Sequence, residues 1–584
     1  MPAKNAIPNV NCLWGEVVAG TLARLGLKQV VIAPGSRSAP LVWGLTREKG
    51  IEAIPVLDER SAGFYALGLA KASGLPVALV CTSGTAAANF FPAIIEASQS
   101  AVPLLVLTAD RPPELRDCHA GQAIDQVKIY GSFVRWQHEL ALPESRVEML
   151  RYLRQTLVQA WERTVQPWAG PVHLNFPFRE PLAPVAQEGF RAPEAKVLAK
   201  LVGEPENGKR GDCNLSFSVS EETRRIFAAK RGVVIAGPEN PGKEKRQRAL
   251  LRWLKERGWP VLADALSPLR RVGGLAAPVM AHYDLVLRSE KARKQLEPEA
   301  VIQIGPLPTS KVLRTWLESL EAPLLVVHDG PENVDPLHRA AIRWRGEAAI
   351  LFLGDGRPVK GSAAYARARE KLESRSAAAV AERFKATDWL FEGKAAWVMS
   401  RVLPKGTPMF VASGMPVRDC EYFWEAGGGQ EIYANRGANG IDGTLSSALG
   451  VAHALRKPTV LYTGDLALLH DQNGFLAAKE LPAGASLTVV LINNDGSGIF
   501  EHLPMAKFEP PFERYFATPQ GVDFAKVADL HGAEYSCPKS WAEFEAAVRK
   551  LPTRGLRLVE VRTDRKRDAA YRKKLFAQIA EKLK

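Results

Sequence analysis

Two apolar stretches that end in polar residues decide the fold: Val460-Leu-Tyr-Thr-Gly464-Asp465 and Leu487-Thr-Val-Val-Leu-Ile-Asn-Asn-Asp-Gly496. Each is typical of a buried strand followed by a ligand-binding turn, because open parallel sheets bind ligands at the carboxyl ends of their strands. An Asp carboxylate and an Asn side-chain carbonyl are hard oxygen ligands for Mg²⁺, which keeps other positions for phosphate, water or backbone oxygens. Either turn alone is common. Together they predict an α/β fold in which one metal ion clamps a diphosphate.

The same strand-then-turn pattern recurs in three blocks, which indicates α/β units with parallel sheets. Strands are predicted at 29–33, 77–81, 104–108 and 171–176; at 232–236, 260–263, 301–305 and 324–328; and at 409–412, 460–463, 487–492 and 557–561. We therefore expect three doubly wound domains, covering residues 1–185, 206–360 and 385–584. A linker rich in Pro, Ala and Glu is expected over about 181–206, and a helical connection over 362–387.

Composition narrows the functional classes. Hydrophobic residues make up 46% and charged residues 24% of the 584 residues, which is ordinary globular usage without extended disorder. The net charge of +14 predicts attraction of anions; small polyanions are favoured over nucleic acid, because no nucleic-acid module is recognised. The six cysteines form no Cys-x-x-Cys pair, which favours a reducing, cytoplasmic location without zinc or disulfides. No apolar run reaches the roughly 18 residues that a membrane span needs.

A third cluster, Leu57-Asp58-Glu59-Arg60-Ser61-Ala62-Gly63, opens a stretch of small apolar residues that extends to Ala70. As a purely structural feature, Asp58 is explained as a helix N-cap with an acid in the first turn. The small residues also permit close packing, and a buried carboxyl with a raised pKa can exchange a proton with a ligand. The residues of this stretch leave both interpretations open.

Asn494 follows Asp465 by 29 residues, and this arrangement resembles the motif of thiamine-diphosphate-dependent enzymes, in which Gly-Asp precedes Asn-Asn. The resemblance implies that Asp465, the side chain of Asn494 and the backbone oxygen of Gly496 hold Mg²⁺ or Mn²⁺, with Asn493 as the alternative to Asn494. It also implies that Glu59 contacts the aminopyrimidine ring of the cofactor and helps to generate the ylid. Ile441 would hold the cofactor bent, and an apolar wall near the thiazolium would consist of Ile499, Phe500 and Leu503.

Five longer sequence motifs indicate which family of thiamine-diphosphate-dependent enzymes the chain resembles. Residues 33–40, 82–86, 108–116, 121–124 and 435–443 read APGSRSAP, TSGTA, TADRPPELR, GQAI and NRGANGIDG. These strings are similar to motifs of the 2-succinyl-5-enolpyruvyl-6-hydroxy-3-cyclohexene-1-carboxylate synthases, a family of menaquinone and phylloquinone biosynthesis. The resemblance covers essentially the whole chain and is weaker between about 185 and 400. It departs at Gly414, where many relatives have serine, and at Val312, where some have arginine.

The resemblance implies a transferase that uses thiamine diphosphate to decarboxylate 2-oxoglutarate. The enzyme would then add the succinyl carbanion equivalent to isochorismate, releasing CO₂ and the product for which the family is named. Substrate-pocket residues carried over from the family are Arg37, Arg111, Gln122, Lys311, Arg418, Arg436, Phe500 and Leu503. The cations among them suit two dicarboxylates, because a planar guanidinium can hold a carboxylate through two hydrogen bonds.

The resemblance further implies a homodimer or homotetramer whose active sites are shared between subunits. Two other functions remain open from the sequence. A different thiamine-dependent 2-oxoacid decarboxylase or carboligase would handle smaller monoanions and would need fewer arginines. A non-catalytic or nucleic-acid-binding protein would bind polyanions with a steep salt dependence and would show no Mg²⁺-linked affinity for thiamine diphosphate.

Overall fold

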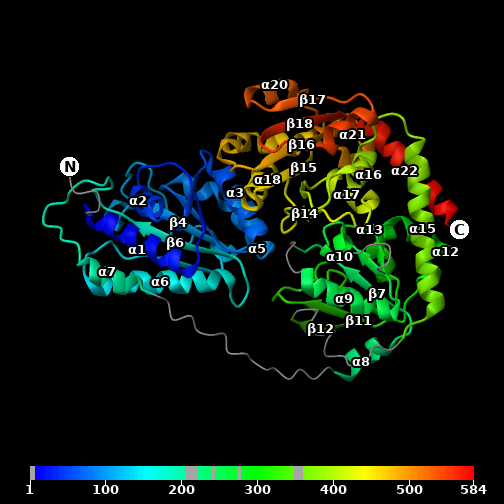
Figure 1. The fold of residues 1–584 in the computed structure, drawn as a ribbon, viewed down its shortest axis with the longest axis horizontal. Coiled ribbons are helices and arrows are strands. Elements are labelled where there is room, and N and C mark those ends of the chain that lie inside the picture. Colours follow the sequence, from blue (N-terminus) through cyan, green and yellow to red (C-terminus); the bar gives the residue numbers. More distant parts are fainter. Residues whose placement is uncertain (1–6, 204–219, 240–243, 273–277, 347–359, 584) are drawn as a thin grey trace. The chain divides into compact units, whose positions relative to one another are not determined.

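In the computed structural model, which describes residues 7–203, 220–239, 244–272, 278–346 and 360–583, the strands form three six-stranded parallel sheets (Figure 1). The expected three-domain α/β architecture is therefore confirmed. The sheets fall one in each of the predicted segments 1–185, 206–360 and 385–584, while the boundaries themselves stay a prediction. None of the helices within these described ranges combines the length and the apolar character needed to cross a bilayer.

The first sheet has the strand order β2-β1-β3-β4-β6-β5. Its strands are β1 (Gln29–Ile32), β2 (Glu52–Pro55), β3 (Val77–Cys81), β4 (Leu104–Asp110), β5 (Trp136–Glu139) and β6 (Pro171–Pro177). The helices that precede, connect or follow these strands are α1 (Val10–Leu25), α2 (Ala39–Arg47), α3 (Glu59–Ser73), α4 (Thr85–Asn89), α5 (Phe91–Gln99), α6 (Val147–Val165) and α7 (Ala195–Val202). Helix α7 lies inside the segment expected to be a linker. Its residue Val202 is buried against α1: a Cβ added at Gly20 of α1 would lie 2.9 Å from Val202 Cγ1.

The second sheet has the order β12-β11-β10-β7-β8-β9. Its strands are β7 (Gly232–Ala236), β8 (Val261–Ala263), β9 (Val279–Met280), β10 (Ala300–Ile304), β11 (Leu324–His328) and β12 (Ala341–Arg345). Its helices are α8 (Glu221–Ala228), α9 (Glu244–Arg257), α10 (Pro268–Val272), α11 (Tyr283–Val286), α12 (Glu290–Gln295) and α13 (Lys311–Glu318). The predicted helical connection over 362–387 is confirmed as α15 (Ala363–Lys385), which buries Leu372, Val380 and Phe384.

The third sheet has the order β14-β13-β15-β16-β18-β17. Its strands are β13 (Pro408–Val411), β14 (Glu431–Tyr433), β15 (Pro458–Gly464), β16 (Ser486–Asn493), β17 (Glu534–Ser536) and β18 (Gly555–Arg562). The helices that precede, connect or follow these strands along the chain are α16 (Glu392–Val402), α17 (Met415–Phe423), α18 (Thr444–Leu455), α19 (Asp465–His470), α20 (Phe524–Leu530), α21 (Trp541–Arg549) and α22 (Arg565–Lys582).

The first and third sheets share one topology. Counted within each sheet, both run 2-1-3-4-6-5, whereas the middle sheet runs 3-2-1-4-5-6. In doubly wound folds, ligands bind beside the carboxyl ends of the strands where the order reverses. In the first sheet this reversal lies between β1 and β3, and in the third between β13 and β15. The strings that carry Arg37, Arg418 and Asp465 follow these strands directly.

The described residues divide into two compact units. One unit contains residues up to 203 together with Asn435–Arg456 and His470–Ala485, so α18 belongs to it, and the other contains the rest. Within the first unit, α18 crosses α3 at close range. A Cβ on Gly68 would lie 2.1 Å from the Ser447 carbonyl oxygen, and one on Gly450 would lie 2.2 Å from that of Tyr65. Glycine is therefore required where the two helix backbones touch.

Candidate active site

Asp465 is the first residue of α19, directly after β15, and it is 5% exposed. Its Oδ1 accepts a hydrogen bond from the Leu466 amide and its Oδ2 accepts one from the Gly496 amide, both at 2.8 Å. Burial raises the pKa of Asp465 to about 6, and these amide donors oppose the rise. Asp465 and Gly496 thus meet at the carboxyl edge of the third sheet. A buried carboxylate with lone pairs left beyond two amide contacts is suited to a cation.

The Asn493-Asn494 pair divides into two different environments. The Asn493 amide group is engaged at both ends: its Nδ2 donates to Glu560 Oε1 at 2.7 Å, and its Oδ1 accepts from the Asp495 amide at 3.2 Å. Asn494 is buried, and its Oδ1 has no hydrogen-bond partner among the described residues, whereas its Nδ2 donates to Glu392 Oε2 at 3.1 Å. A buried amide oxygen without a donor costs free energy unless a ligand satisfies it. The geometry therefore favours Asn494 over Asn493 as the candidate metal ligand.

Gly496 completes this cluster with its backbone. Its φ is +139°, and a Cβ there would lie 2.4 Å from the Ala517 carbonyl oxygen, so only glycine fits the turn. Among the described residues, no group of three or more His, Cys, Asp and Glu side chains is arranged to hold a metal ion. The candidate set is instead one carboxylate, one amide oxygen and one backbone oxygen, which is a set that Mg²⁺ accepts.

Glu59 is the first residue of α3 and follows the N-cap Asp58, whose side chain accepts from the Arg60 amide at 2.9 Å. Hydrogen bonds from Arg60, together with one from Asn473, hold the pKa of Asp58 at about 2 against the effect of burial. The structural interpretation of Asp58 is therefore confirmed. Glu59 itself is half-buried and lines a pocket in the first unit together with Leu57, Asp58, Arg60, Asn89, Asn473 and Leu476. This placement leaves the Glu59 carboxyl accessible to a ligand.

Ile441 lies in the loop before α18 and is half-buried. Its carbonyl accepts from Thr444 Oγ1 at 2.9 Å, which ties the loop to the first turn of the helix. Two residues later, Gly443 has φ +61°, and a Cβ there would lie 1.8 Å from the Phe64 ring of α3. Within the first unit, the loop that carries Ile441 is thus held against the helix that begins with Glu59.

Three of the predicted substrate residues gather at the carboxyl edge of the first sheet. Arg111 Nη1 donates to Ser83 Oγ at 2.7 Å, and Gln122 Nε2 donates to the Ser83 carbonyl at 3.1 Å. Arg37 is 8% exposed; its Nη1 donates to the Phe178 carbonyl at 3.0 Å and lies 3.3 Å from Glu180 Oε1. Burial, and then the charge of Arg111, lowers the pKa of Arg37. The buried Arg37 Nε has no hydrogen-bond partner among the described residues, so this edge is suited to an anion.

Arg436 lies in the loop between β14 and α18, and sequence reasoning missed the two residues that hold this loop. Glu96 accepts from the Gly437 amide at 3.0 Å and from the Ala438 amide at 2.7 Å. Lys71 Nζ donates to Glu96 Oε1 at 3.2 Å and to Asn435 Oδ1 at 2.9 Å. Lys71 and Glu96 are both buried, on α3 and α5. The sequence does contain a signal for this pair: Lys71 and Glu96 are each a single charged residue within an otherwise apolar stretch, which predicts a buried ion pair.

The remaining predicted residues belong to the second unit. Arg418 lies on α17, where burial lowers its pKa and its Nη1 donates to the Gly414 carbonyl at 2.6 Å. Lys311 begins α13 and is exposed. Ile499 and Phe500 lie on the short helix η4 (Gly498–His502), followed by Leu503, and all three are partly exposed apolar side chains. Arg418 and Lys311 thus lie on two different helices of this unit, α17 and α13 (Figure 1).

The two departures from the family have local explanations. Gly414 has φ +96° before α17, a backbone conformation that a serine adopts only with strain. Val312 lies on α13 and packs against the hydrophobic core, where an arginine side chain would have to leave the core to reach solvent.

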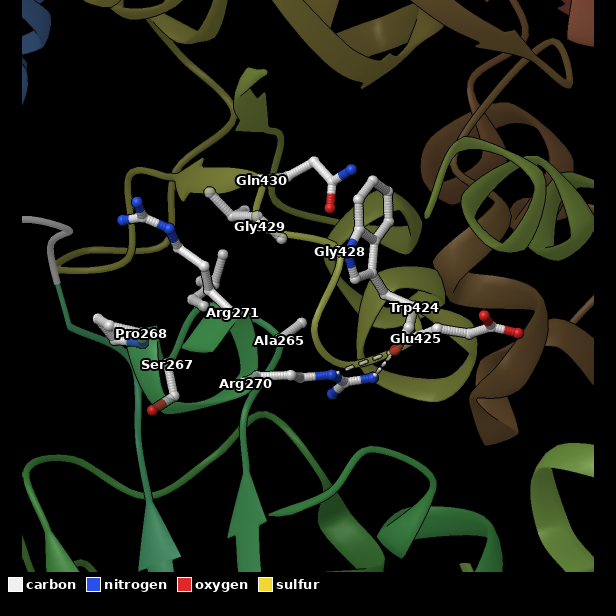
Figure 2. Close-up of a pocket in the computed structure, with 12 residues that line it drawn as sticks. Ala265, Ser267, Pro268, Arg270, Arg271, Trp424, Glu425, Gly428, Gly429 and Gln430 are labelled. Atoms are coloured by element: carbon white, nitrogen blue, oxygen red, sulfur yellow. Dashed lines mark hydrogen bonds between the residues drawn. The ribbon is translucent and has the colours of Figure 1, made fainter. Parts of the chain in front are cut away.

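A further pocket lies between the β8–α10 segment and the end of α17, and Figure 2 shows its lining. Its most buried cation, Arg270, donates to the carbonyl oxygens of Cys420 and Trp424, each at 3.2 Å. Arg271 pairs with Glu431 at 3.1 Å. These carbonyls end α17, and a cation at a helix C-terminus stabilises it. None of the predicted site residues lines this pocket, whose Arg270 supports the helix that carries Arg418.

Known proteins resemble this chain over nearly its whole length. Models of the thiamine pyrophosphate enzyme family match residues 14–129 (N-terminal TPP binding domain), 211–411 (middle domain) and 413–561 (C-terminal TPP binding domain). Three similar proteins are each named 2-succinyl-5-enolpyruvyl-6-hydroxy-3-cyclohexene-1-carboxylate synthase. The protein from Trichormus variabilis is 46% identical to this chain, and the alignment covers 98% of this chain and 99% of the relative. The protein from Gloeothece citriformis is 46% identical, with 97% of this chain and 97% of the relative covered. The protein from Microcystis aeruginosa is 47% identical, with 95% of this chain and 97% of the relative covered. The chain therefore belongs to the 2-succinyl-5-enolpyruvyl-6-hydroxy-3-cyclohexene-1-carboxylate synthases, a family of thiamine pyrophosphate enzymes.

Proposed function

We propose that this protein decarboxylates 2-oxoglutarate with the help of thiamine diphosphate and joins the remaining succinyl portion to isochorismate. The products are CO₂ and 2-succinyl-5-enolpyruvyl-6-hydroxy-3-cyclohexene-1-carboxylate, for menaquinone or phylloquinone biosynthesis. The observation that carries the substrate class is the pair Arg37 and Arg111, two neighbouring guanidinium groups with an unused buried donor. Both proposed substrates are dicarboxylates, which such groups bind through paired hydrogen bonds.

Each residue has a separate task in this proposal. Asp465, Asn494 and Gly496 would hold Mg²⁺ or Mn²⁺, whose charge would meet that of the diphosphate. Glu59 exchanges a proton with the aminopyrimidine ring, while Ile441, Ile499 and Phe500 form apolar contacts with the cofactor. Carboxylates of the substrates are held by Arg37, Arg111, Gln122, Lys311, Arg418 and Arg436, with Phe500 and Leu503 beside them. When bound, thiamine diphosphate supplies the nucleophilic carbon and the electron sink for decarboxylation.

The direct test is a reaction containing isochorismate, 2-oxoglutarate, thiamine diphosphate and Mg²⁺, followed by the mass of the product. The proposal predicts consumption of 2-oxoglutarate in preference to pyruvate and the appearance of the coupled product. Preferential consumption of pyruvate would instead support another thiamine-dependent decarboxylase or carboligase, and the dicarboxylate assignment would be wrong.

Asp465→Asn is expected to weaken the binding of thiamine diphosphate, and additional Mg²⁺ should restore part of it. The substitution removes the ligand charge but keeps an oxygen atom at the same place. The measurement is calorimetric titration of thiamine diphosphate at several Mg²⁺ concentrations. A folded variant with unchanged affinity would remove Asp465 from the metal site.

We also propose that the enzyme is a dimer or tetramer whose active sites take Glu59 from one subunit and Asp465 from its neighbour. Mixing inactive Glu59→Gln with inactive Asp465→Asn protein should then restore activity after subunit exchange. Random pairing leaves about half of the dimers mixed, each with one intact site, so roughly a quarter of the wild-type sites return. Mass spectrometry of differently labelled chains verifies the exchange. Verified exchange without recovery would show that the two residues do not meet across subunits.

The cytoplasm is the compartment that we propose for this enzyme. Among the described residues, Cys12, Cys81, Cys118, Cys420 and Cys537 are free thiols, which is the usual state in a reducing environment.

A further inference from the structure

Glu392 is a buried carboxylate that the proposed chemistry does not use, and it contacts Asn494. It begins α16, is 2% exposed and lies 102 positions from Asn494 in sequence. Its Oε2 accepts from Asn494 Nδ2 at 3.1 Å. Burying a charged group is costly, so a carboxylate in this place needs compensating partners.

The further contacts of Glu392 come from α22 and β15, and Arg572 of α22 also reaches α17. Arg572 of α22 donates to Glu392 Oε1 at 2.7 Å and to Asp419 Oδ1 of α17 at 2.6 Å. The Glu392 amide donates to Asp568 Oδ2 at 3.1 Å, and Tyr462 Oη of β15 donates to the Glu392 carbonyl at 3.1 Å. Arg572, Asp419 and Asp568 are each at most 1% exposed. Both carboxylate oxygens of Glu392 therefore accept hydrogen bonds, one from Arg572 and the other from Asn494.

This contact determines which end of the Asn494 amide faces the site. The oxygen and nitrogen ends of an amide have nearly the same shape but opposite hydrogen-bonding roles. Glu392 Oε2 accepts from the Asn494 nitrogen, so the amide oxygen is turned away from Glu392. Gly498 closes the same side, because a Cβ there would lie 2.6 Å from Asn494 Nδ2. The oxygen left over is the buried Oδ1 that has no partner among the described residues.

We propose that Glu392 is a positioning residue that orients the Asn494 amide so that its oxygen, and not its nitrogen, faces the metal ion. The inference rests on the proposed function, in which Asn494 is a metal ligand. Arg572 holds the carboxylate in place, and through Asp419 the same arginine reaches α17, the helix of Arg418. Residues that orient metal ligands contribute substantially to metal affinity.

Glu392→Gln is expected to weaken the apparent affinity for Mg²⁺ about 10- to 100-fold, measured through the Mg²⁺ dependence of thiamine diphosphate binding. The Gln oxygen can still accept from Arg572, but its nitrogen then meets the nitrogen of Asn494. The Asn494 amide relieves this clash by turning over, which presents N–H groups to the cation. Isothermal titration calorimetry reads the affinity without relying on turnover, and circular dichroism with the melting temperature reads the fold.

The matched control is Glu421→Gln. Glu421 is also a buried carboxylate of the second unit, 1% exposed, and it pairs with the buried Arg270 while accepting from the Ala265 amide at 2.7 Å. A general loss of stability would appear in both variants, whereas a positioning role affects only Glu392→Gln. We expect the Mg²⁺ dependence of Glu421→Gln to stay within about threefold of wild type.

A second variant keeps the inference testable if Glu392→Gln does not fold. Asn494→Asp introduces a charged ligand that would ordinarily bind Mg²⁺ more tightly. Here it places a second carboxylate against Glu392, so we expect weaker Mg²⁺ binding. In the double variant, Glu392→Gln with Asn494→Asp, the Gln nitrogen can donate to the new carboxylate, and Mg²⁺ affinity should exceed that of Asn494→Asp alone.

Several results would overturn the assignment: wild-type Mg²⁺ affinity in Glu392→Gln, an equal loss in Glu421→Gln, tighter Mg²⁺ binding in Asn494→Asp alone, or no gain in the double variant. Failure of the proposed function looks different. In that case the wild-type protein itself shows no Mg²⁺-dependent binding of thiamine diphosphate.

Discussion

Glu59→Gln is expected to lower turnover by at least about a hundredfold while thiamine diphosphate stays bound, which is the lower range for loss of acid-base catalysis. The carboxyl group lies in the first turn of α3, half-buried in a pocket, where it can reach a ligand. Glutamine keeps the shape and can form hydrogen bonds, but it cannot exchange a proton with the cofactor. The measurements are kcat, the Kd for thiamine diphosphate and the rate of hydrogen–deuterium exchange at the thiazolium C2 carbon.

Glu148→Gln is the matched control for this prediction. Glu148 also lies in the first turn of a helix of the same unit, α6, but it is exposed. Any general effect of removing an acid near a helix N-terminus should therefore appear in both variants. Turnover of Glu148→Gln should remain near wild type. Near-normal C2 exchange in Glu59→Gln would show that another group performs the proton transfer.

Replacing Arg37, Arg418 or Arg436 with alanine is expected to cost about 2–5 kcal/mol in substrate binding, because a partly buried carboxylate loses its partner. That range corresponds to roughly thirtyfold to several thousandfold in affinity. Lysine should rescue only part of the loss, since a point charge cannot reproduce the two-pronged contact of a guanidinium. Affinity for thiamine diphosphate should stay near normal, because the metal and backbone groups meet the charge of the diphosphate.

The measurement for each arginine is paired: the apparent affinities for 2-oxoglutarate and isochorismate, and the affinity for the cofactor. Arg225→Ala is the control, because Arg225 is exposed and pairs with Glu221 one helical turn away, a contact worth at most about 1 kcal/mol. A loss confined to the cofactor would place that arginine at the diphosphate. No loss in either measurement would exclude it from the site.

Sequence pattern predicted the interior strands of all three sheets and missed the edge strands. The predicted runs 104–108 and 487–492, for example, lie within the strands Leu104–Asp110 and Ser486–Asn493, which are buried on both faces. The edges β2, β5, β14 and β17 read EAIP, WQHE, EIY and EYS, each with a glutamate, while β12 contains two arginines and β9 has two residues. Charged and short edges prevent uncontrolled pairing between sheets, but they also remove the continuous apolar run that identifies a strand.

Within the candidate site, the sequence identified residues that directly follow predicted strands. Asp465, Asn494 and Arg37 are of this kind, because the end of a parallel strand is a fixed place in the fold. The choice between Asn493 and Asn494 could not be predicted, since both are amides in the same turn. The structure distinguishes them by their neighbours: Glu560 and the Asp495 amide engage Asn493, whereas the Asn494 oxygen is left without a donor among the described residues.

The sequence by itself thus determined the α/β class, the three parallel sheets and the turns that present the candidate ligands, because these depend on local apolar runs and on turn residues. Only the tertiary structure decided which distant side chains support those turns. Glu392 reaches Asn494 across 102 positions, and Glu96 reaches the Gly437 amide across 341. Such partners leave no periodic signal along the chain. Their contacts arise from the packing of whole helices against one another, and the cost of burying a charge allows them only where a partner of opposite polarity is already in place.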